Sequence, residues 1–214
     1  MKRRAFSVLS LSALSPLALL SAQAQTPDFK EGIHYLSLKS RVPTEVDKGK
    51  IEVLEFFWYN CPHCNTFEPA LSEWSKKLPK DVTLKRVPVR FRDEFEPQQR
   101  AYYVLEALGK VEELHVKMFA AIHVERQNLT KLDALLVWAE KNGIPAKQFT
   151  DLYNSFSVIG KARQAAKLQE QFKVEGVPAL GIGGRYYVDG TLAGNMLRAL
   201  QITDFLTAEI RKGR

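Results

Sequence analysis

Apolar residues along the chain recur with two spacings, one typical of strands and the other of helices. Residues 51–59, IEVLEFFWY, are a nearly continuous apolar, β-branched and aromatic run, which predicts a buried strand. From Pro62 to about Leu78 the apolar positions follow a helical spacing, and proline suits the first turn of a helix because its missing N–H has no partner there. Residues 82–91, VTLKRVPVRF, alternate in character and predict a second strand, and a short strand is predicted at 35–38.

A block of helices follows the second strand. Helical spacing begins near Pro97 and continues to about residue 173. Gly109 and Gly143 stand where C-terminal helix caps are expected. We therefore predict that residues 93–165 form a helical insertion.

The strand pattern returns towards the C-terminus. Residues 178–190, PALGIGGRYYVDG, predict a hairpin with Gly183 and Gly184 at its turn, and residues 195–213 predict a closing helix. The order of strand, helix, strand, helical block, hairpin and helix predicts an α/β fold.

The first 24 residues have the pattern of a secretory signal peptide. A basic start, MKRR, precedes an apolar stretch without acids, and Ala22-Gln23-Ala24 has the form of a signal-peptidase site. The alternative is a first transmembrane helix, which the shortness of the apolar stretch, Pro16 and the many serines disfavour. We expect cleavage near Ala24 and an exported protein.

The charge of the chain excludes one class of partner. The formal net charge is +7, and three of these charges belong to Lys2, Arg3 and Arg4 of the signal segment. In the remainder, acidic and basic residues are interspersed without a run of one sign. This pattern predicts a mildly basic surface and no nucleic-acid partner.

The two cysteines of the chain, Cys61 and Cys64, point to redox chemistry. Exported cysteines tend to be oxidised, but a disulfide across two residues closes a loop too short to stabilise a fold. Cys61 falls where the strand meets the helix, and the positive end of a helix lowers the pKa of a thiol. We expect Cys61 to be the reacting sulfur and His63 to assist its ionisation. We expect Cys64 to be partly covered and to act as the resolving cysteine.

Half of a zinc site is the alternative for the cysteine pair. Zinc requires three or four protein ligands, and the chain has no second cysteine pair. The other histidines, His34, His115 and His123, lack ligand spacing, so we expect them on the surface or between helices. We therefore expect neither a metal nor a cofactor.

Two segments of the chain resemble a known family. VLEFFWYNCPHCNTFEP, residues 53–69, and VEGVPAL, residues 174–180, are similar to the DsbA family of periplasmic thiol:disulfide interchange proteins. The Cys-Pro-His-Cys tetrapeptide is the specific part of this resemblance. It implies a thioredoxin-like fold with an inserted helical domain, made of residues 25–92 and 166–214 around residues 93–165.

The resemblance also implies roles for individual residues. Cys61 and Cys64 match the redox-active disulfide, and Val177-Pro178 matches a substrate-binding loop whose proline is cis. Glu55 matches a buried acid that assists proton transfer to the resolving cysteine; from the sequence alone it is either buried for a purpose or at an exposed strand end. The expected catalytic residues are Cys61, Cys64, His63, Pro62 and Glu55. The family would also place a lysine near the buried acid, where this chain offers Lys85 and Arg86 in an undetermined register.

The function that the resemblance implies is donation of a disulfide in the periplasm. A stabilised Cys61 thiolate favours the dithiol form, so the disulfide is passed to newly exported, cysteine-containing proteins through a mixed disulfide. A quinone-linked membrane oxidase of the DsbB type is the implied second partner, and we expect a monomer. The alternatives are a disulfide isomerase or reductase on the same fold, or a periplasmic chaperone-like binding module.

Overall fold

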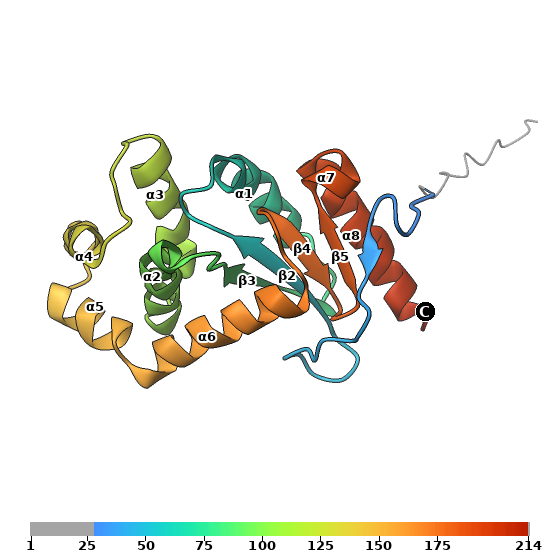
Figure 1. Cartoon of the computed structure of the whole chain (residues 1–214), viewed down its shortest axis with the longest axis horizontal. Helices are drawn as coiled ribbons and strands as arrows, with labels where there is room; N and C mark the ends of the chain where they lie inside the picture. The colour runs from blue at the N-terminus through green and yellow to red at the C-terminus, as the bar shows by residue number, and fades with distance from the viewer. Residues whose placement is uncertain (1–27, 214) are drawn as a thin grey trace, which may run out of the picture.

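A five-stranded sheet forms the centre of the molecule (Figure 1). The structure, a computed structural model, describes residues 28–213. The strands lie in the order β1-β5-β4-β2-β3, with β2 and β3 parallel and the other neighbours antiparallel. Their bounds are Leu36–Ser37 for β1, Ile51–Phe57 for β2, Val82–Pro88 for β3, Ala179–Ile182 for β4 and Tyr186–Asp189 for β5.

The predicted signal peptide, residues 1–24, lies outside the described residues. Within residues 28–213, no helix combines the length and the apolar character that crossing a membrane requires.

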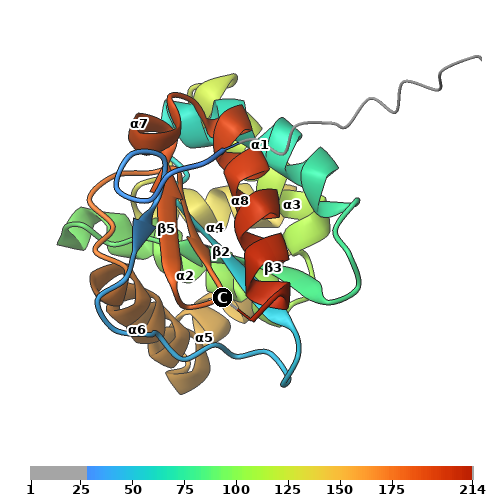
Figure 2. The ribbon, with the colours of Figure 1, turned by 90° about the vertical axis from the view of Figure 1, so that its right-hand side faces the viewer.

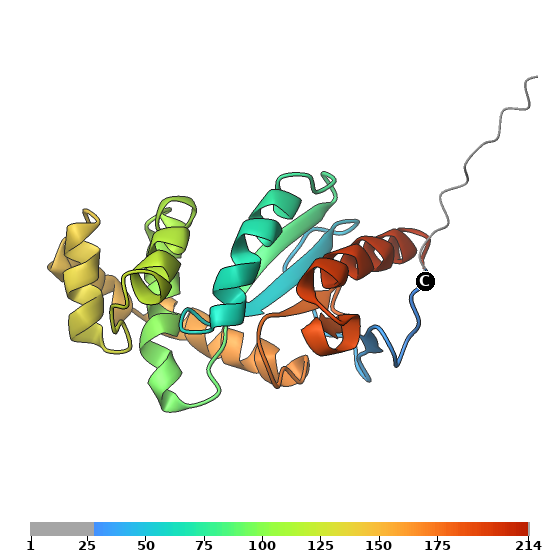
Figure 3. The same ribbon diagram turned by 90° about the horizontal axis from the view of Figure 1, so that it is seen from above.

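Helices cover both faces of the sheet (Figures 2 and 3). Helices α1, Pro62–Ser75, and α8, Met196–Arg211, lie on one face, where Val53 of β2 joins their apolar side chains in one core. Helix α6, Phe156–Gln171, lies on the other face, where Leu54 and Phe56 point. Because successive side chains of a strand point to opposite faces, the apolar run of β2 supplies both cores.

The remaining long helices form a group beside one end of the sheet, which we call the helical part (Figure 1). They are α2, Glu96–Ala107, α3, Val111–His123, α4, Leu132–Lys141, and α5, Ala146–Tyr153. A short 3₁₀ turn, Asp93–Phe95, precedes α2. The division at residues 93–165 stays a prediction, and its second boundary falls inside α6, which is continuous from 156 to 171.

The turn predictions are confirmed, and three predicted strands are shorter in the structure: β1 covers 36–37 of the predicted 35–38, and β2 ends at Phe57 rather than at residue 59. Gly109 and Gly143 follow helices with φ of 65° and 78°, and the hairpin glycines Gly183 and Gly184 have φ of 58° and 64°. In the left-handed region glycine escapes the penalty that a β-carbon brings. The second strand, predicted to reach residue 91, ends at Pro88 because its neighbour β2 ends at the paired Phe57. A four-residue helix, α7, Gly190–Ala193, was not predicted.

Candidate active site

Cys61 is the N-cap residue of α1. Its backbone is extended, with φ −79° and ψ 116°, and Pro62 opens the helix. The backbone N–H of Cys64 donates to the Cys61 sulfur across 3.4 Å. The Cys61 sulfur thus takes the place that a hydroxyl or carboxylate oxygen holds at other helix starts, and it lies in the positive field of the helix end.

The two thiols differ in their environment. The structure describes the dithiol form, in which Cys61 is 7% exposed and Cys64 is fully buried. The pKa of Cys61 is lowered to about 6, chiefly by a hydrogen bond from the Cys64 thiol, although burial opposes this shift. The backbone N–H groups of Cys64 and His63 and the His63 side chain act in the same direction as the hydrogen bond. Burial, together with the neighbouring Cys61 sulfur, raises the pKa of Cys64 far above its usual value. Near neutral pH the structure therefore pairs one thiolate with one thiol.

Alkylation kinetics should report this difference. In the reduced protein, iodoacetamide should modify Cys61 with a rate that rises through a midpoint near pH 6, because the thiolate is the nucleophile. Cys64 should stay unmodified in the folded protein over the same range. Mass spectrometry of the digested protein separates the two sites, and a midpoint above about pH 8, the range of an unperturbed cysteine, would contradict the assignment.

The Val177–Pro178 peptide bond faces the cysteine pair and is cis. In its protonated form, the Cys61 thiol donates to the carbonyl of Val177 across 3.4 Å. A groove of about 710 Å³ runs beside this contact, and the exposed His63 lines it together with both loop residues. Its apolar wall comes from α1 and the start of α8 and includes Phe67, Ala70, Met196 and Leu197.

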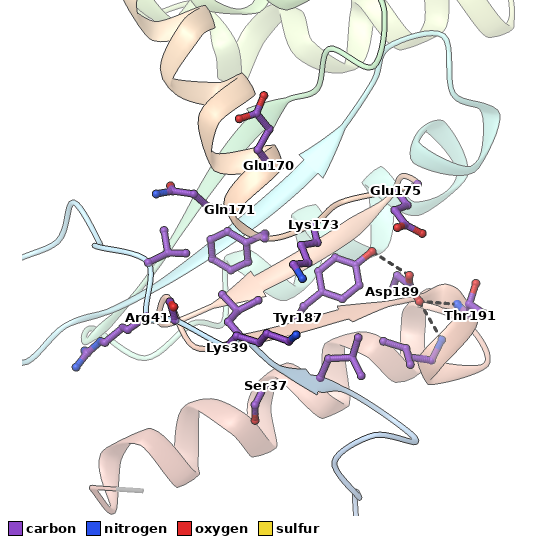
Figure 4. A pocket seen from close by; sticks show the side chains of 17 residues that line it. Ser37, Lys39, Arg41, Glu170, Gln171, Lys173, Glu175, Tyr187, Asp189 and Thr191 are labelled. Carbon is purple, nitrogen blue, oxygen red and sulfur yellow. Dashed lines mark hydrogen bonds between the residues drawn. The ribbon is translucent and has the colours of Figure 1, made fainter.

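A second groove of about 940 Å³ lies on the other side of this loop, at the edge of the sheet (Figure 4). It is bounded by residues 36–42 and 170–176. Tyr187 donates from its hydroxyl to Asp189 across 2.9 Å. The two grooves share Gly176, Asp189 and Thr191, so the loop before Pro178 separates two concave surfaces.

A buried cluster of charges lies beneath Cys64. Glu55 lies on β2 and is fully buried, which is the first of the two alternatives that the sequence left open. It is paired with Arg86 of the neighbouring strand β3. The Arg86 Nε lies 3.2 Å from Glu55 Oε2, and its Nη2 lies 2.6 Å from Oε1 of Glu68 on α1. This register settles which base approaches the acid: it is Arg86, whereas Lys85 pairs with Glu45.

One cation serves two carboxyl groups in this cluster, so the two titrate differently. Burial, reinforced by Glu68 and opposed by Arg86, raises the pKa of Glu55 to about 8. Burial also acts on Glu68, but His115, whose Nε2 lies 3.4 Å away, and the hydrogen-bonded Arg86 outweigh it and lower the pKa of Glu68. Among the described residues, neither Glu55 oxygen has a hydrogen-bond partner. Glu55 therefore keeps its proton near neutral pH, and its ionised form would raise the pKa of Cys64.

Two members of this site were missed in the sequence, Glu68 and His115. His115, expected on the surface or between helices, is 3% exposed and lies 2.8 Å from the Tyr59 hydroxyl and 3.4 Å from Glu68. Glu68 lies in the apolar stripe of α1 with Cys64, Phe67 and Leu71, and His115 follows the buried Leu114 in α3. A charged residue inside an apolar stripe is the signal that would have found Glu68. Among residues 28–213, no group of three or more His, Cys, Asp or Glu side chains is arranged to hold a metal ion.

Comparisons with known proteins show one family for this chain. Residues 52–201 match the family model described as "DSBA-like thioredoxin domain". The chain is 38% identical over 206 residues to the "Thiol:disulfide interchange protein DsbA" of Bordetella parapertussis, covering 96% of both chains. The protein of the same name from Pseudomonas aeruginosa PAO1 is 36% identical over 204 residues, covering 95% of this chain and 96% of the relative. The crystal structure of Pseudomonas aeruginosa DsbA superposes with a TM-score of 0.82 at 35% identity, covering 87% of this chain and 96% of that chain.

Proposed function

The chain belongs to the family of DsbA-like thioredoxin domains, and we propose that it works as an oxidant, giving up a Cys61–Cys64 disulfide to other proteins. Membership makes the chain a thiol:disulfide oxidoreductase whose substrates are proteins with cysteines. The direction of transfer and the roles of the individual residues are the proposal.

The reaction proceeds through a mixed disulfide. A substrate thiolate attacks the Cys61 sulfur of the oxidised protein, the Cys61–Cys64 bond breaks, and Cys64 takes a proton from Glu55. A second substrate thiolate then attacks the substrate sulfur bound to Cys61, and Cys61 leaves as a thiolate. The substrate loses two electrons and gains a disulfide, while the protein gains the two electrons and becomes a dithiol.

The observation that carries this direction is the position of the Cys61 sulfur at the N-terminus of α1. There the pKa of Cys61 is lowered to about 6, so at pH 7 the dithiol form holds a thiolate that is a good leaving group. A stabilised thiolate favours reduction of the protein and hence oxidation of the substrate. The family comparison supports the class of reaction, and this asymmetry supports its direction.

Substrate binding is assigned to the groove beside Val177 and Pro178. An extended segment lying along the loop brings its cysteine to Cys61, which contacts the Val177 carbonyl. The apolar wall of the groove suits unfolded polypeptide, which exposes apolar side chains. Pro62 fixes the start of α1, and His63 adds a polar group at the rim.

The proposed place of action is the periplasm, after removal of residues 1–24. The proposed partners are newly exported proteins with cysteines and a quinone-linked membrane oxidase of the DsbB type, which restores the disulfide. The proposed oligomeric state is a monomer.

Equilibration with glutathione tests the direction. We expect the protein to be half reduced at a ratio [GSH]²/[GSSG] far below the one that opens a structural disulfide, with each tenfold difference in this ratio corresponding to about 30 mV. The redox state is read from alkylation of the free thiols after acid quenching. A pair that stays closed as firmly as a structural disulfide would refute the oxidant and favour a reductase on the same fold.

A further inference from the structure

We infer that helix α3 positions the reactive thiol through two histidines, His115 and His123, which hold the two ends of Tyr59. The inference rests on the proposed role of Cys61 as the reacting sulfur. It assigns both histidines as positioning residues, because neither touches Cys61.

Tyr59 is attached to α3 at its backbone and at its side chain. The Nε2 of His123 donates to the Tyr59 carbonyl across 2.7 Å, and the Tyr59 hydroxyl lies 2.8 Å from Nδ1 of His115. Eight residues of a helix span about 12 Å, so Tyr59 lies along the helix rather than across it. The ring of Phe119, between the two histidines in the sequence, has its centroid 5.1 Å from that of Tyr59.

Tyr59 belongs to the turn that delivers Cys61 to the helix. The turn is closed by the Cys61 N–H, which donates to the Trp58 carbonyl across 3.0 Å. The helical part also holds the residues on either side of Tyr59: the amide of Gln98 donates to Asn60 across 2.6 Å, and Trp58 stacks on Phe95. Three consecutive residues before Cys61 are therefore fixed from one side.

The Cys61 sulfur is sensitive to movement of this turn. Its contacts with the Cys64 N–H and the Val177 carbonyl are both 3.4 Å long. The field of a helix end falls off within one turn, so a small displacement of the turn weakens the stabilisation of the thiolate. Loss of either attachment should therefore raise the pKa of Cys61.

The protonation states suit this arrangement. Burial raises the pKa of Tyr59 well above its usual value, so its hydroxyl keeps the proton. Burial lowers the pKa of His115 against the opposing Glu68, so a neutral His115 accepts from Tyr59 at Nδ1 and turns Nε2–H towards Glu68. His123 donates from Nε2. The same contacts thus link the turn to the buried charge cluster.

The test compares His123→Leu with His123→Gln in the full mature protein. Leucine removes the donor, whereas the glutamine amide keeps an N–H at a similar distance from the backbone. His123→Leu should raise the pKa of Cys61, measured by the ultraviolet absorbance of the thiolate, by about one unit, and should shift the glutathione equilibrium about tenfold towards the disulfide. His123→Gln should restore the wild-type pKa and equilibrium. Tyr59→Phe removes only the side-chain attachment and should shift the Cys61 pKa and the glutathione equilibrium in the same direction. It takes the place of His123→Leu if that variant does not fold.

Leu135→Ala serves as the control for loss of stability, because Leu135 is a fully buried residue of α4. It should lower the melting temperature and leave the pKa of Cys61 unchanged. A wild-type pKa in both His123→Leu and Tyr59→Phe, or an equal shift in Leu135→Ala, would overturn the inference. Failure of the proposed oxidant function would instead show in the glutathione equilibrium of the unaltered protein.

Discussion

Replacing Cys64 with alanine should stop turnover, and the mixed disulfide that Cys61 forms by exchange with a disulfide-linked substrate should accumulate. Cys64 is one helical turn from Cys61, so it attacks a mixed disulfide at Cys61 intramolecularly and is favoured over thiols in solution. Without it, the protein can neither store a disulfide nor release a substrate whose second thiol is out of reach. A peptide with one cysteine, supplied as its disulfide-linked dimer, should therefore be attacked by the Cys61 thiolate, which releases one peptide thiol and leaves a stable adduct, visible by mass spectrometry under non-reducing conditions.

Cys61→Ala is the matched control for this experiment. It should also stop turnover, but it should capture no peptide, because the remaining thiol of Cys64 is fully buried and its pKa is raised. Capture by Cys61→Ala, or continued turnover by Cys64→Ala, would contradict the division of roles between the two cysteines.

Replacing Arg86 with methionine should destabilise the protein by about 3–5 kcal/mol, because it leaves Glu55 and Glu68 buried without their cation. The loss should depend on pH with a definite sign. Without Arg86 the pKa values of both carboxyl groups rise, so protonation at low pH relieves the repulsion and ionisation at high pH restores it. Chemical denaturation should therefore show a smaller loss at pH 5 than at pH 8.

Lys85→Met is the control for Arg86→Met, since it changes the neighbouring residue of the same strand. Lys85 pairs with Glu45, which is 57% exposed, so the loss should stay below about 1 kcal/mol. An equal loss in the two variants, or a loss in Arg86→Met that grows at low pH, would show that the cluster does not depend on Arg86 for its charge balance.

Local patterns in the sequence predict much of this site. The apolar run of β2 followed by Pro62 places Cys61 at a helix start, and the N-cap geometry confirms that position. Gly183 and Gly184 place the hairpin turn, which brings β5 beside β4. The cis bond at Val177–Pro178 followed from the family resemblance rather than from the local pattern.

The missed features depend on contacts between distant segments. Choosing Arg86 over Lys85 requires the register of β3 against β2, and a shift of one residue exchanges the two faces. His115 meets Tyr59 across 56 positions of sequence, and no spacing along α3 reveals that meeting. Glu68 is the exception, because its place in an apolar stripe is visible without the fold.

Helix α6 limits how the molecule can be recombined with its relatives. It contacts α2, α5 and β3, and Phe172 just beyond its end packs on Phe56 of the sheet. A chimera joined between residues 165 and 166 would take the two halves of this helix from different proteins. The helix would form only if both halves lay on one axis. The backbone leaves the helical path only at Lys173, where φ is 53°, so a helical part transplanted from another protein should carry the whole of α6 with it.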